Sequence, residues 1–478
     1  MALQVQPART LVSVPPPVPS ADIVSAALVA LCGAMALASF LTSDPLRNDF
    51  ERFTTLWLLF VFFVLFAALS AAYFALYRQG ATISSRHPVV ITLGCVGCLL
   101  ISFPVGSKDI FGYAFLGRMW GTLHVNPYVV SPLQFSSDGW FPSLVGTLRR
   151  PLSVYGPLFM WQSWLVNAMA GQSLWVAVWL HKIVAVLELL AALGIARASL
   201  AAVPTAAPRP WLLLLLAWNP LLLFEAAGSA HNDVAMVLLL TAAIWCWNAG
   251  RSRAAFGCLV LSFWYKWYGL IFVPAFLIEA LKIEGLRAAA RQALWFTVYT
   301  AVCGVLLLVP LHGAVPSIVA QFAHPEKMRG IFPNELSPPL AVLFWSLRAA
   351  GLFATDRGFD IFNGIRSAAF AAAISVTFIR QWRAAPSIPA LLESCTLSGL
   401  AFFMLLITQL WPWHLLTVIT MSILTGREPF IGLGVVLSIL ALLSNFVTFA
   451  VATLMFGAVA GALWLMRRPR KSPAAVPI

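Results

Sequence analysis

Long apolar runs alternate with short polar segments along most of the chain. Because about 20 consecutive apolar residues cover the hydrocarbon core of a bilayer, twelve of these runs predict membrane-spanning helices. They lie near residues 21–42, 56–78, 88–105, 175–196, 211–226, 234–249, 292–311, 361–379, 388–409, 413–426, 429–443 and 446–466. Backbone groups in lipid must be satisfied within the segment, which favours helices. We therefore predict an all-α, polytopic membrane protein with about twelve spans.

Composition agrees with this pattern. Of the 478 residues, 61% are hydrophobic and only 10% are charged, which is far more apolar than a soluble domain requires. The net charge of +13 admits a nucleic-acid partner. The basic residues, however, form short clusters between apolar runs, as the positive-inside rule describes, and do not form one long tract. We expect the lipid bilayer as a partner and no nucleic acid.

The basic clusters also orient the chain. They all fall on one side if the N-terminus is cytoplasmic. The outer side then holds the loop 106–150, the segment from Gly228 to Asp233, and the corner from Trp411 to His414. The clusters are Arg78 with Arg86, Arg251 with Arg253, Arg380 with Arg383, and the final group Arg467, Arg468, Arg470 and Lys471. We expect a multi-pass protein of the cytoplasmic membrane with its site on the extracytoplasmic face.

This orientation requires two segments that do not cross. Residues 151–170 are expected to dip into the membrane, and residues 254–280 to form a hairpin of two half-helices around Lys266. The alternative is that Arg287 and Arg291 break the positive-inside rule.

Three regions follow from the same pattern. The Pro-rich residues 1–20 are predicted to be a disordered tail. Residues 21–466 form the transmembrane domain, and residues 467–478 form a basic cytoplasmic tail. All seven cysteines lie in apolar runs, where Cys95 and Cys98 are interpreted as core packing, so we predict no metal, no cofactor and no disulfide framework.

The stretch KDIFGYAFLGRMWGTLHVNPY, residues 108–128, carries the sharpest candidate, Asp109. A carboxylate near a low-dielectric boundary binds protons more tightly, which suits a general base for a hydroxyl nucleophile. The alternative is a helix-terminal acid paired with Lys108 or Arg118.

Two cations are candidates to hold a phosphate. Arg118 offers a bidentate fork, and Lys266 a point charge within the aromatic run FWYKWYG. Snorkelling to the interface is the alternative for Arg118.

Further polar and aromatic residues are candidate substrate contacts. His231, Asn232 and Asp233 are consecutive polar residues between two apolar runs, although Asn232 or Asp233 could simply cap a helix. The aromatic residues stack on a sugar or form an interfacial belt. The candidates are Tyr113, Asn126, Tyr128, Tyr155, His231, Asn232, Asp233, Trp413 and His414, with Trp411 and the loop residues His324, Glu326, Lys327, Arg329, Asn334 and Glu335 nearby. Glu188 and Glu393, inside predicted spans, receive no role.

Several fragments carry a resemblance. They are D-I-F-G-Y-A-F-L-G-R from Asp109 followed by Pro127-Tyr128, V-Y-G-P-L-F from Val154, W-N-P-L-L-L-F-E-A-A-G-S-A-H-N-D from Trp218, and W-P-W-H from Trp411. In this order they resemble GT-C glycosyltransferases that use polyprenyl-phosphate sugars, in particular bacterial polyprenol-phosphate-mannose-dependent alpha-mannosyltransferases and glycosyltransferase family 87.

The resemblance implies a GT-C-like fold, a polyprenyl-phosphate sugar donor and inversion at the anomeric carbon. It gives Asp109 the role of base, and it favours mannose as the hexose and an envelope glycan or glycolipid as the acceptor. His414 departs from the family, which commonly has Tyr there.

Two other classes of protein stay open. A transporter or flippase of a lipid-linked sugar would show internal repeats, and we find none. A structural membrane protein would not explain Asp109 or the segment from His231 to Asp233.

Overall fold

The computed structural model describes residues 21–41, 56–80, 87–144, 152–202, 210–323, 338–352, 356–407 and 410–444, with a few single residues beyond. Within these ranges the secondary structure is helical and contains no strand, which confirms the all-α class. The helices are α1 (Ala21–Phe40), α2 (Leu56–Gln79), α3 (Pro88–Ile101), α4 (Asp109–Gly121), α6 (Pro157–Ala170), α7 (Leu174–Ala202), α8 (Pro210–Ala217), α9 (Pro220–Leu223), α10 (Asp233–Asn248), α11 (Ser252–Tyr265), α12 (Val273–Glu284), α13 (Leu286–Leu308), α14 (Ala314–Ala323), α16 (Pro338–Ala349), α17 (Asp356–Arg383), α18 (Ile388–Ala401), α19 (Leu416–Leu424) and α20 (Phe430–Leu443).

Among the described residues, six helices are long and apolar enough to cross a membrane, and a pair bent by 47°, α8 with Pro220–Gly228, makes up to seven. Four shorter apolar helices are Pro88–Ile101, Asp233–Asn248, Pro412–Leu424 and Phe430–Leu443. The protein is therefore a polytopic membrane protein. The predicted spans before residue 446 coincide with these elements, whereas most of 446–466 lies outside the described residues. The number of membrane crossings, about twelve, stays a prediction.

Helix breaks follow local chemistry. Pro220 lacks the N–H that would continue α8, and it opens α9 at the first turn, where that N–H has no intrahelical partner. The Asn219 side chain caps α9 by accepting a hydrogen bond from the Leu222 N–H at 3.0 Å. Ser387 caps α18 in the same way, through the Ala390 N–H.

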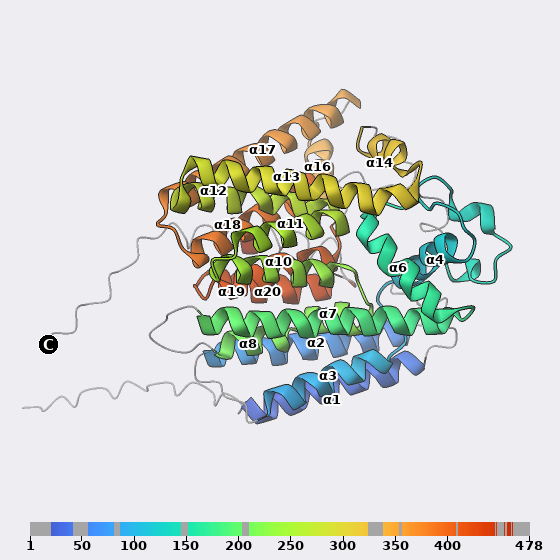
Figure 1. The fold of residues 1–478 in the computed structure, drawn as a ribbon. Coiled ribbons are helices and arrows are strands. Elements are labelled where there is room, and N and C mark those ends of the chain that lie inside the picture. The colour runs from blue at the N-terminus through green and yellow to red at the C-terminus, as the bar shows by residue number, and fades with distance from the viewer. Residues whose placement is uncertain are drawn as a thin grey trace, which may run out of the picture.

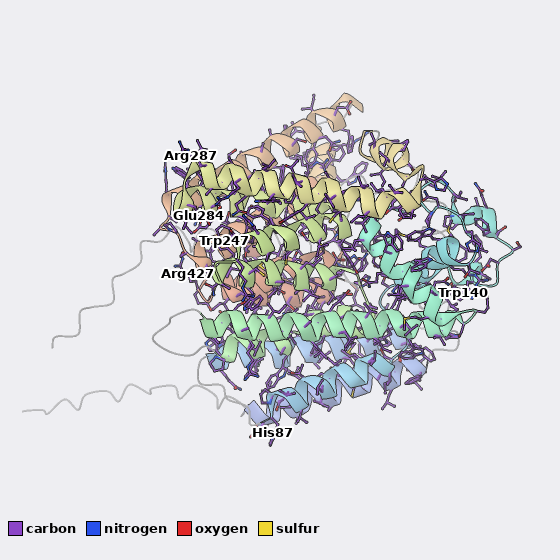
Figure 2. All side chains as sticks on the ribbon, viewed as in Figure 1. His87, Trp140, Trp247, Glu284, Arg287 and Arg427 are labelled. Atoms are coloured by element: carbon purple, nitrogen blue, oxygen red, sulfur yellow. The ribbon has the colours of Figure 1, made fainter. Side chains whose placement is uncertain are left out.

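Most helices have roughly parallel axes and pack in layers (Figure 1). Helices α1, α2 and α3 form one side, α7 and α8 lie against them, α10, α11 and α18 to α20 fill the middle, and α12, α13 and α17 form the other side. Helices α4 and α6 lie at one end of the bundle. Figure 2 places Trp140 at that end, which we call the Trp140 end. Trp247, Glu284, Arg287 and Arg427 lie at the opposite, Arg287 end.

The predicted hairpin around Lys266 is confirmed as a helix break. Helix α11 ends at Tyr265, Lys266 is extended, and a 3-10 turn, η5 (Trp267–Phe272), leads into α12. Because Trp247 and Glu284 both lie at the Arg287 end, the chain leaves that end and returns to it (Figure 2). Lys266 is therefore at the turn of the hairpin.

The segments around the predicted outer loop differ from expectation. Residues 106–150 were predicted as a loop, but α4 begins at Asp109, so Asp109 opens a new helix and does not end a span. Pro104 and Gly106 between α3 and α4 explain the break. The dipping segment forms α6, a helix of 14 residues at the Trp140 end (Figure 1). Whether it enters the bilayer stays a prediction.

Candidate active site

The turn before α10 brings an imidazole into the core. Residues Phe224–Gly228 form a single π-helical turn, η4, a feature frequent at functional sites. Ala230 follows with φ of 55°, a left-handed conformation that is uncommon for a residue other than glycine. The His231 N–H then donates to the Glu225 carbonyl at 2.8 Å. This backbone path folds the His231 ring back over the Glu225 side chain.

Asp109, His231 and Glu225 form a line. Nδ1 of His231 lies 2.6 Å from Oε2 of Glu225, and Nε2 lies 3.9 Å from Oδ2 of Asp109. The His231 ring is fully buried and stacks on Trp413, with ring centroids 3.7 Å apart and planes 14° apart. Because the carboxylate of Glu225 and the ring of Trp413 fix the imidazole, its Nε2 stays directed at Asp109.

Asp109 is the member of this line that a ligand can reach. Its side chain is 25% exposed, while those of His231 and Glu225 are 0% and 2% exposed. Burial of the carboxyl raises the pKa of Asp109 above its usual value, the nearby His231 and Lys266 oppose this, and Asp233 adds to it. A reachable carboxylate with a raised pKa suits proton abstraction.

A buried ion pair lies beside the line. Oδ2 of Asp233 is 2.6 Å from Nζ of Lys266, and the Tyr268 hydroxyl donates to Oδ1 at 2.9 Å. Asp233 is fully buried, so these two partners compensate its charge. The pair joins the start of α10 to the hairpin turn.

Aromatic side chains form the neighbouring wall. The Tyr113 hydroxyl donates to Oδ1 of Asn232 at 3.4 Å, and its ring meets Tyr155 edge-on at 5.3 Å. The Tyr128 hydroxyl donates to the Tyr155 carbonyl at 2.5 Å, which fixes the backbone there.

Three buried polar atoms of the turn have no hydrogen-bond partner within the described part of the chain. They are Oγ of Ser229, Nε2 of His231 and Nδ2 of Asn232. Buried polar groups are nearly always hydrogen-bonded in the working state of a protein.

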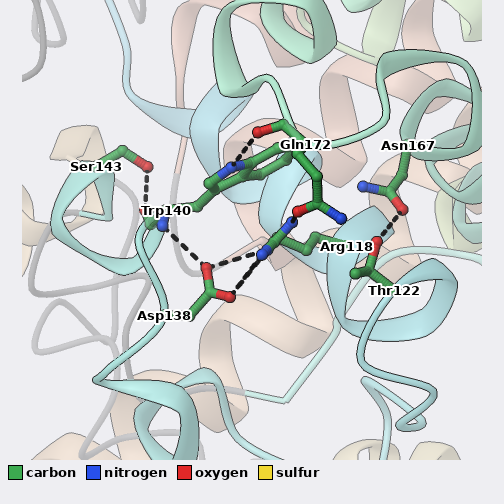
Figure 3. Close-up of polar contacts among 7 residues, drawn as sticks. All are labelled: Arg118, Thr122, Asp138, Trp140, Ser143, Asn167 and Gln172. Carbon is green, nitrogen blue, oxygen red and sulfur yellow. Dashed lines mark hydrogen bonds and ion pairs between the residues drawn. The ribbon is translucent and has the colours of Figure 1, made fainter.

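Arg118 and Asn126 make contacts elsewhere. Figure 3 shows the Arg118 guanidinium held by Asp138, with Nε at 2.9 Å from Oδ2, by Gln172 through Nη1 at 2.8 Å, and over the Trp140 ring at 4.7 Å. Asn126 donates to the Leu311 and His312 carbonyls at 3.1 and 2.8 Å. Both side chains therefore hold loops together, and the structure does not bring them to the Asp109 line.

Comparisons with known proteins place the chain in a family. A family model described as the N-terminal domain of alpha-(1->6)-mannopyranosyltransferases matches residues 21–282, more than half of the 478 residues. The chain belongs to this family. The match includes α4, the turn before α10 and the hairpin at Lys266, so the assembled cluster lies almost wholly within the family region.

Two relatives of the mannopyranosyltransferase family are similar over shorter stretches. An alpha-(1->6)-mannopyranosyltransferase of Mycobacterium tuberculosis is 29% identical over 151 residues, 30% of this chain and 24% of that protein. A probable alpha-(1->6)-mannopyranosyltransferase of Mycolicibacterium smegmatis is 31% identical over 156 residues, 30% of this chain and 26% of that protein. The matched part is thus about a quarter of each relative's length. No solved structure gives a significant match.

The remaining candidates fall around the cluster of this family member or outside it. His414 stacks on Phe403 with centroids 5.6 Å apart, and its Nδ1 accepts the Trp411 N–H at 3.3 Å. Glu393 pairs with Arg427 at 2.7 Å. The residues His324, Glu326, Lys327, Arg329, Asn334 and Glu335 lie outside the described residues. Within the described ranges no group of three or more His, Cys, Asp or Glu side chains is arranged so that it could hold a metal ion.

Glu225 is the residue that sequence reasoning missed. It lies six positions before His231 within an apolar run, FEAAGSAH, where a lone carboxylate is costly in a membrane and functional by default. A helical interpretation of this run does not place the two side chains in contact. The π-helical turn and the left-handed Ala230 create that contact.

Proposed function

We propose that the protein is a membrane mannosyltransferase that transfers a hexose from a polyprenyl-phosphate sugar to a glycan or glycolipid acceptor of the cell envelope. Membership of the mannopyranosyltransferase family supports the reaction class. The helical membrane domain supports a lipid-borne donor, because its tail can lie between helices while the sugar reaches a polar site.

Asp109 acts as the general base. It removes the proton from an acceptor hydroxyl, whose oxygen then attacks the anomeric carbon of the donor sugar. The bond between that carbon and the phosphate oxygen breaks, and the polyprenyl phosphate leaves with the electron pair. Attack from the face opposite the leaving group inverts the anomeric centre. The proton remains on Asp109 or passes to solvent.

His231 and Glu225 support the base. Nε2 of His231 lies behind Asp109, 3.9 Å from Oδ2, and the 2.6 Å contact between Nδ1 and Glu225 holds the ring in place. Lys266 faces the developing charge on the phosphate. One of its three N–H donors is directed at Asp233, which leaves two for a ligand.

The cluster is proposed to face the outside of the cytoplasmic membrane. Arg287 and Arg427 lie at the end opposite Trp140 (Figure 2), and by the positive-inside rule that end is cytoplasmic. The exposed carboxylate of Asp109 beside the buried His231 and Glu225 pair is the observation that carries the function.

Reconstitution separates an enzyme from a transporter. Purified protein in liposomes receives labelled polyprenyl-phosphate mannose and a mannoside glycolipid acceptor on one side. We expect a labelled glycosidic product whose anomeric configuration is the inverse of the donor's. Movement of the intact donor across the bilayer with no product would overturn the proposal in favour of a flippase.

A further inference from the structure

An arginine lies inside α17, a helix long and apolar enough to span the membrane. Nη1 of Arg366 donates to the Leu406 carbonyl at 3.3 Å, and Nε is buried without a protein partner among the described residues. A guanidinium carries five N–H donors, so one neutral carbonyl leaves most of its capacity unused. A cation at membrane depth without a carboxylate indicates an anionic ligand.

Asn363 adds a polar group to the same face. It precedes Arg366 by one helical turn, and residues three apart on a helix are neighbours. Its Oδ1 is also buried without a protein partner in the described part of the chain, and the Nδ2 of the same amide is the donor for a phosphate oxygen. Two apolar side chains of the same helix segment, Ile361 and Ile365, are 56% and 54% exposed, so they face lipid. The polar pair therefore borders the bilayer.

Arg366 lies at about the depth of Lys266. Lys282, near the Arg287 end, donates to the Gln381 carbonyl at 2.8 Å, which fixes the level of Gln381. Arg366 precedes Gln381 by 15 residues of α17, or about 22 Å. Lys266 follows Ser252, at the same end, by 14 residues, or about 21 Å. Both cations thus lie about 21 to 22 Å along their helices from the Arg287 end.

A π-helical turn lies between Arg366 and the residues that hold Lys266. The π-helical turn η7 (Phe402–Leu406) ends α18, and Arg366 contacts its last carbonyl. At its start, Phe403 meets the Tyr268 ring at 5.1 Å, and Tyr268 in turn donates to Asp233 of the active site. Arg366 and the Asp233–Lys266 pair therefore flank the same five residues.

We propose that Arg366 and Asn363 bind the phosphate of a lipid that enters between helices, and that this lipid is the polyprenyl-phosphate donor. The proposal rests on the proposed function, because it names the donor of that reaction. Asp233 already compensates the charge of Lys266, whereas no carboxylate in the described ranges pairs with Arg366. Arg118 likewise has its charge compensated by Asp138.

Direct binding tests the site without any need for transfer. Full-length protein in phosphatidylcholine nanodiscs is titrated with polyprenyl monophosphate, which carries no sugar, and separately with phosphatidylglycerol. Because a charged hydrogen bond is lost, Arg366→Gln should weaken polyprenyl phosphate binding about tenfold or more, and Arg366→Lys by less. Arg380→Gln, an exposed arginine of the same helix, is the matched control and should bind like wild type.

Other outcomes have defined meanings. Wild-type affinity in Arg366→Gln overturns the proposal. An equal loss for phosphatidylglycerol overturns the donor assignment and leaves a general anionic-lipid site. If Arg366→Gln does not fold, Asn363→Ala replaces it, and unchanged binding there has the same negative meaning. Binding that depends on Arg366 in a protein that transfers no sugar would refute the proposed function alone.

Discussion

Asp109 combines partial exposure with a carboxyl group that is disfavoured in its ionised form. The Asp109 side chain is reachable, and behind it His231 is locked by Glu225 and Trp413. These contacts hold one accessible carboxylate on a rigid support, which is the arrangement that the proposed proton abstraction from a hydroxyl requires.

The pH dependence of transfer should report this base. Only ionised Asp109 accepts a proton, so kcat/KM should fall as pH is lowered through its pKa. An ordinary aspartate titrates at about pH 3.9. Because burial raises the pKa of Asp109, the acid limb of the profile should lie above that pH. A profile flat down to pH 4, measured with enzyme that stays folded, would contradict the assignment.

The raised pKa of Asp109 also affects the stability of the folded protein. A pKa raised in the folded state means that ionised Asp109 costs stability, and that this cost disappears as pH falls through the folded pKa. Asp109→Asn should therefore be at least as stable as wild type at neutral pH, which makes it a clean variant for activity measurements.

Glu225→Gln tests the support behind the base. Gln keeps the shape but loses the charge that holds His231 at 2.6 Å. Because charge-assisted hydrogen bonds contribute about 1.5–3 kcal/mol, we expect transfer to fall about tenfold or more. Glu393→Gln, which removes the partner of Arg427, is the control and should transfer normally. Equal rates for the two variants would show that the Glu225 pair is not needed.

At the scale of elements, close helix packing fixes the position of α4. A Cβ on Gly117 would lie 2.2 Å from the Ser163 carbonyl of α6, so only glycine permits this approach. A Cβ on Gly156 would lie 2.1 Å from the Trp264 carbonyl, which holds the start of α6 against the end of α11. These two contacts join α4, α6 and the Lys266 hairpin into one support for Asp109.

Gly117→Ala should therefore destabilise the protein by about 1–3 kcal/mol, since overpacking forces the helices apart. Gly257→Ala, in α11, is the matched control, because no atom lies within 4 Å of its added Cβ. Alanine is the better helix former, so this variant should be as stable as wild type or slightly more stable. Thermal unfolding in detergent measures both. Equal midpoints for the two variants would refute the close packing.

Sequence patterns predicted the elements better than their contacts. Apolar length indicated the spans, and basic residues on both sides of Lys266 predicted the hairpin turn that the structure confirms. The pairing of Arg118 with Asp138 was not predicted, because Asp138 lies in an irregular segment whose path no periodicity specifies. The contact of Glu225 with His231 was missed because it depends on backbone dihedral angles at Ala230.

At the scale of the whole molecule, the proposed function places the Trp140 end on the outside of the membrane. Ser136, in the segment near Trp140, and Glu284, at the opposite end, are both exposed. In intact cells, a membrane-impermeant maleimide should label Ser136→Cys and should not label Glu284→Cys until the membrane is opened. Wild type gives the background, since its seven cysteines are buried or half-buried. The reverse labelling pattern would place the site in the cytoplasm.

Paired asparagine variants test whether Asp109 is the base of a hexosyl transfer. Transfer from labelled polyprenyl-phosphate mannose is measured for wild type, Asp109→Asn, Asp233→Asn and Asp138→Asn, with folding checked for each. Asp138, bound to Arg118 at the same end, controls for the loss of any nearby carboxylate. We predict that Asp109→Asn loses transfer by about a hundredfold or more while Asp138→Asn retains it. Full activity in Asp109→Asn, with activity abolished in Asp233→Asn, would contradict the account.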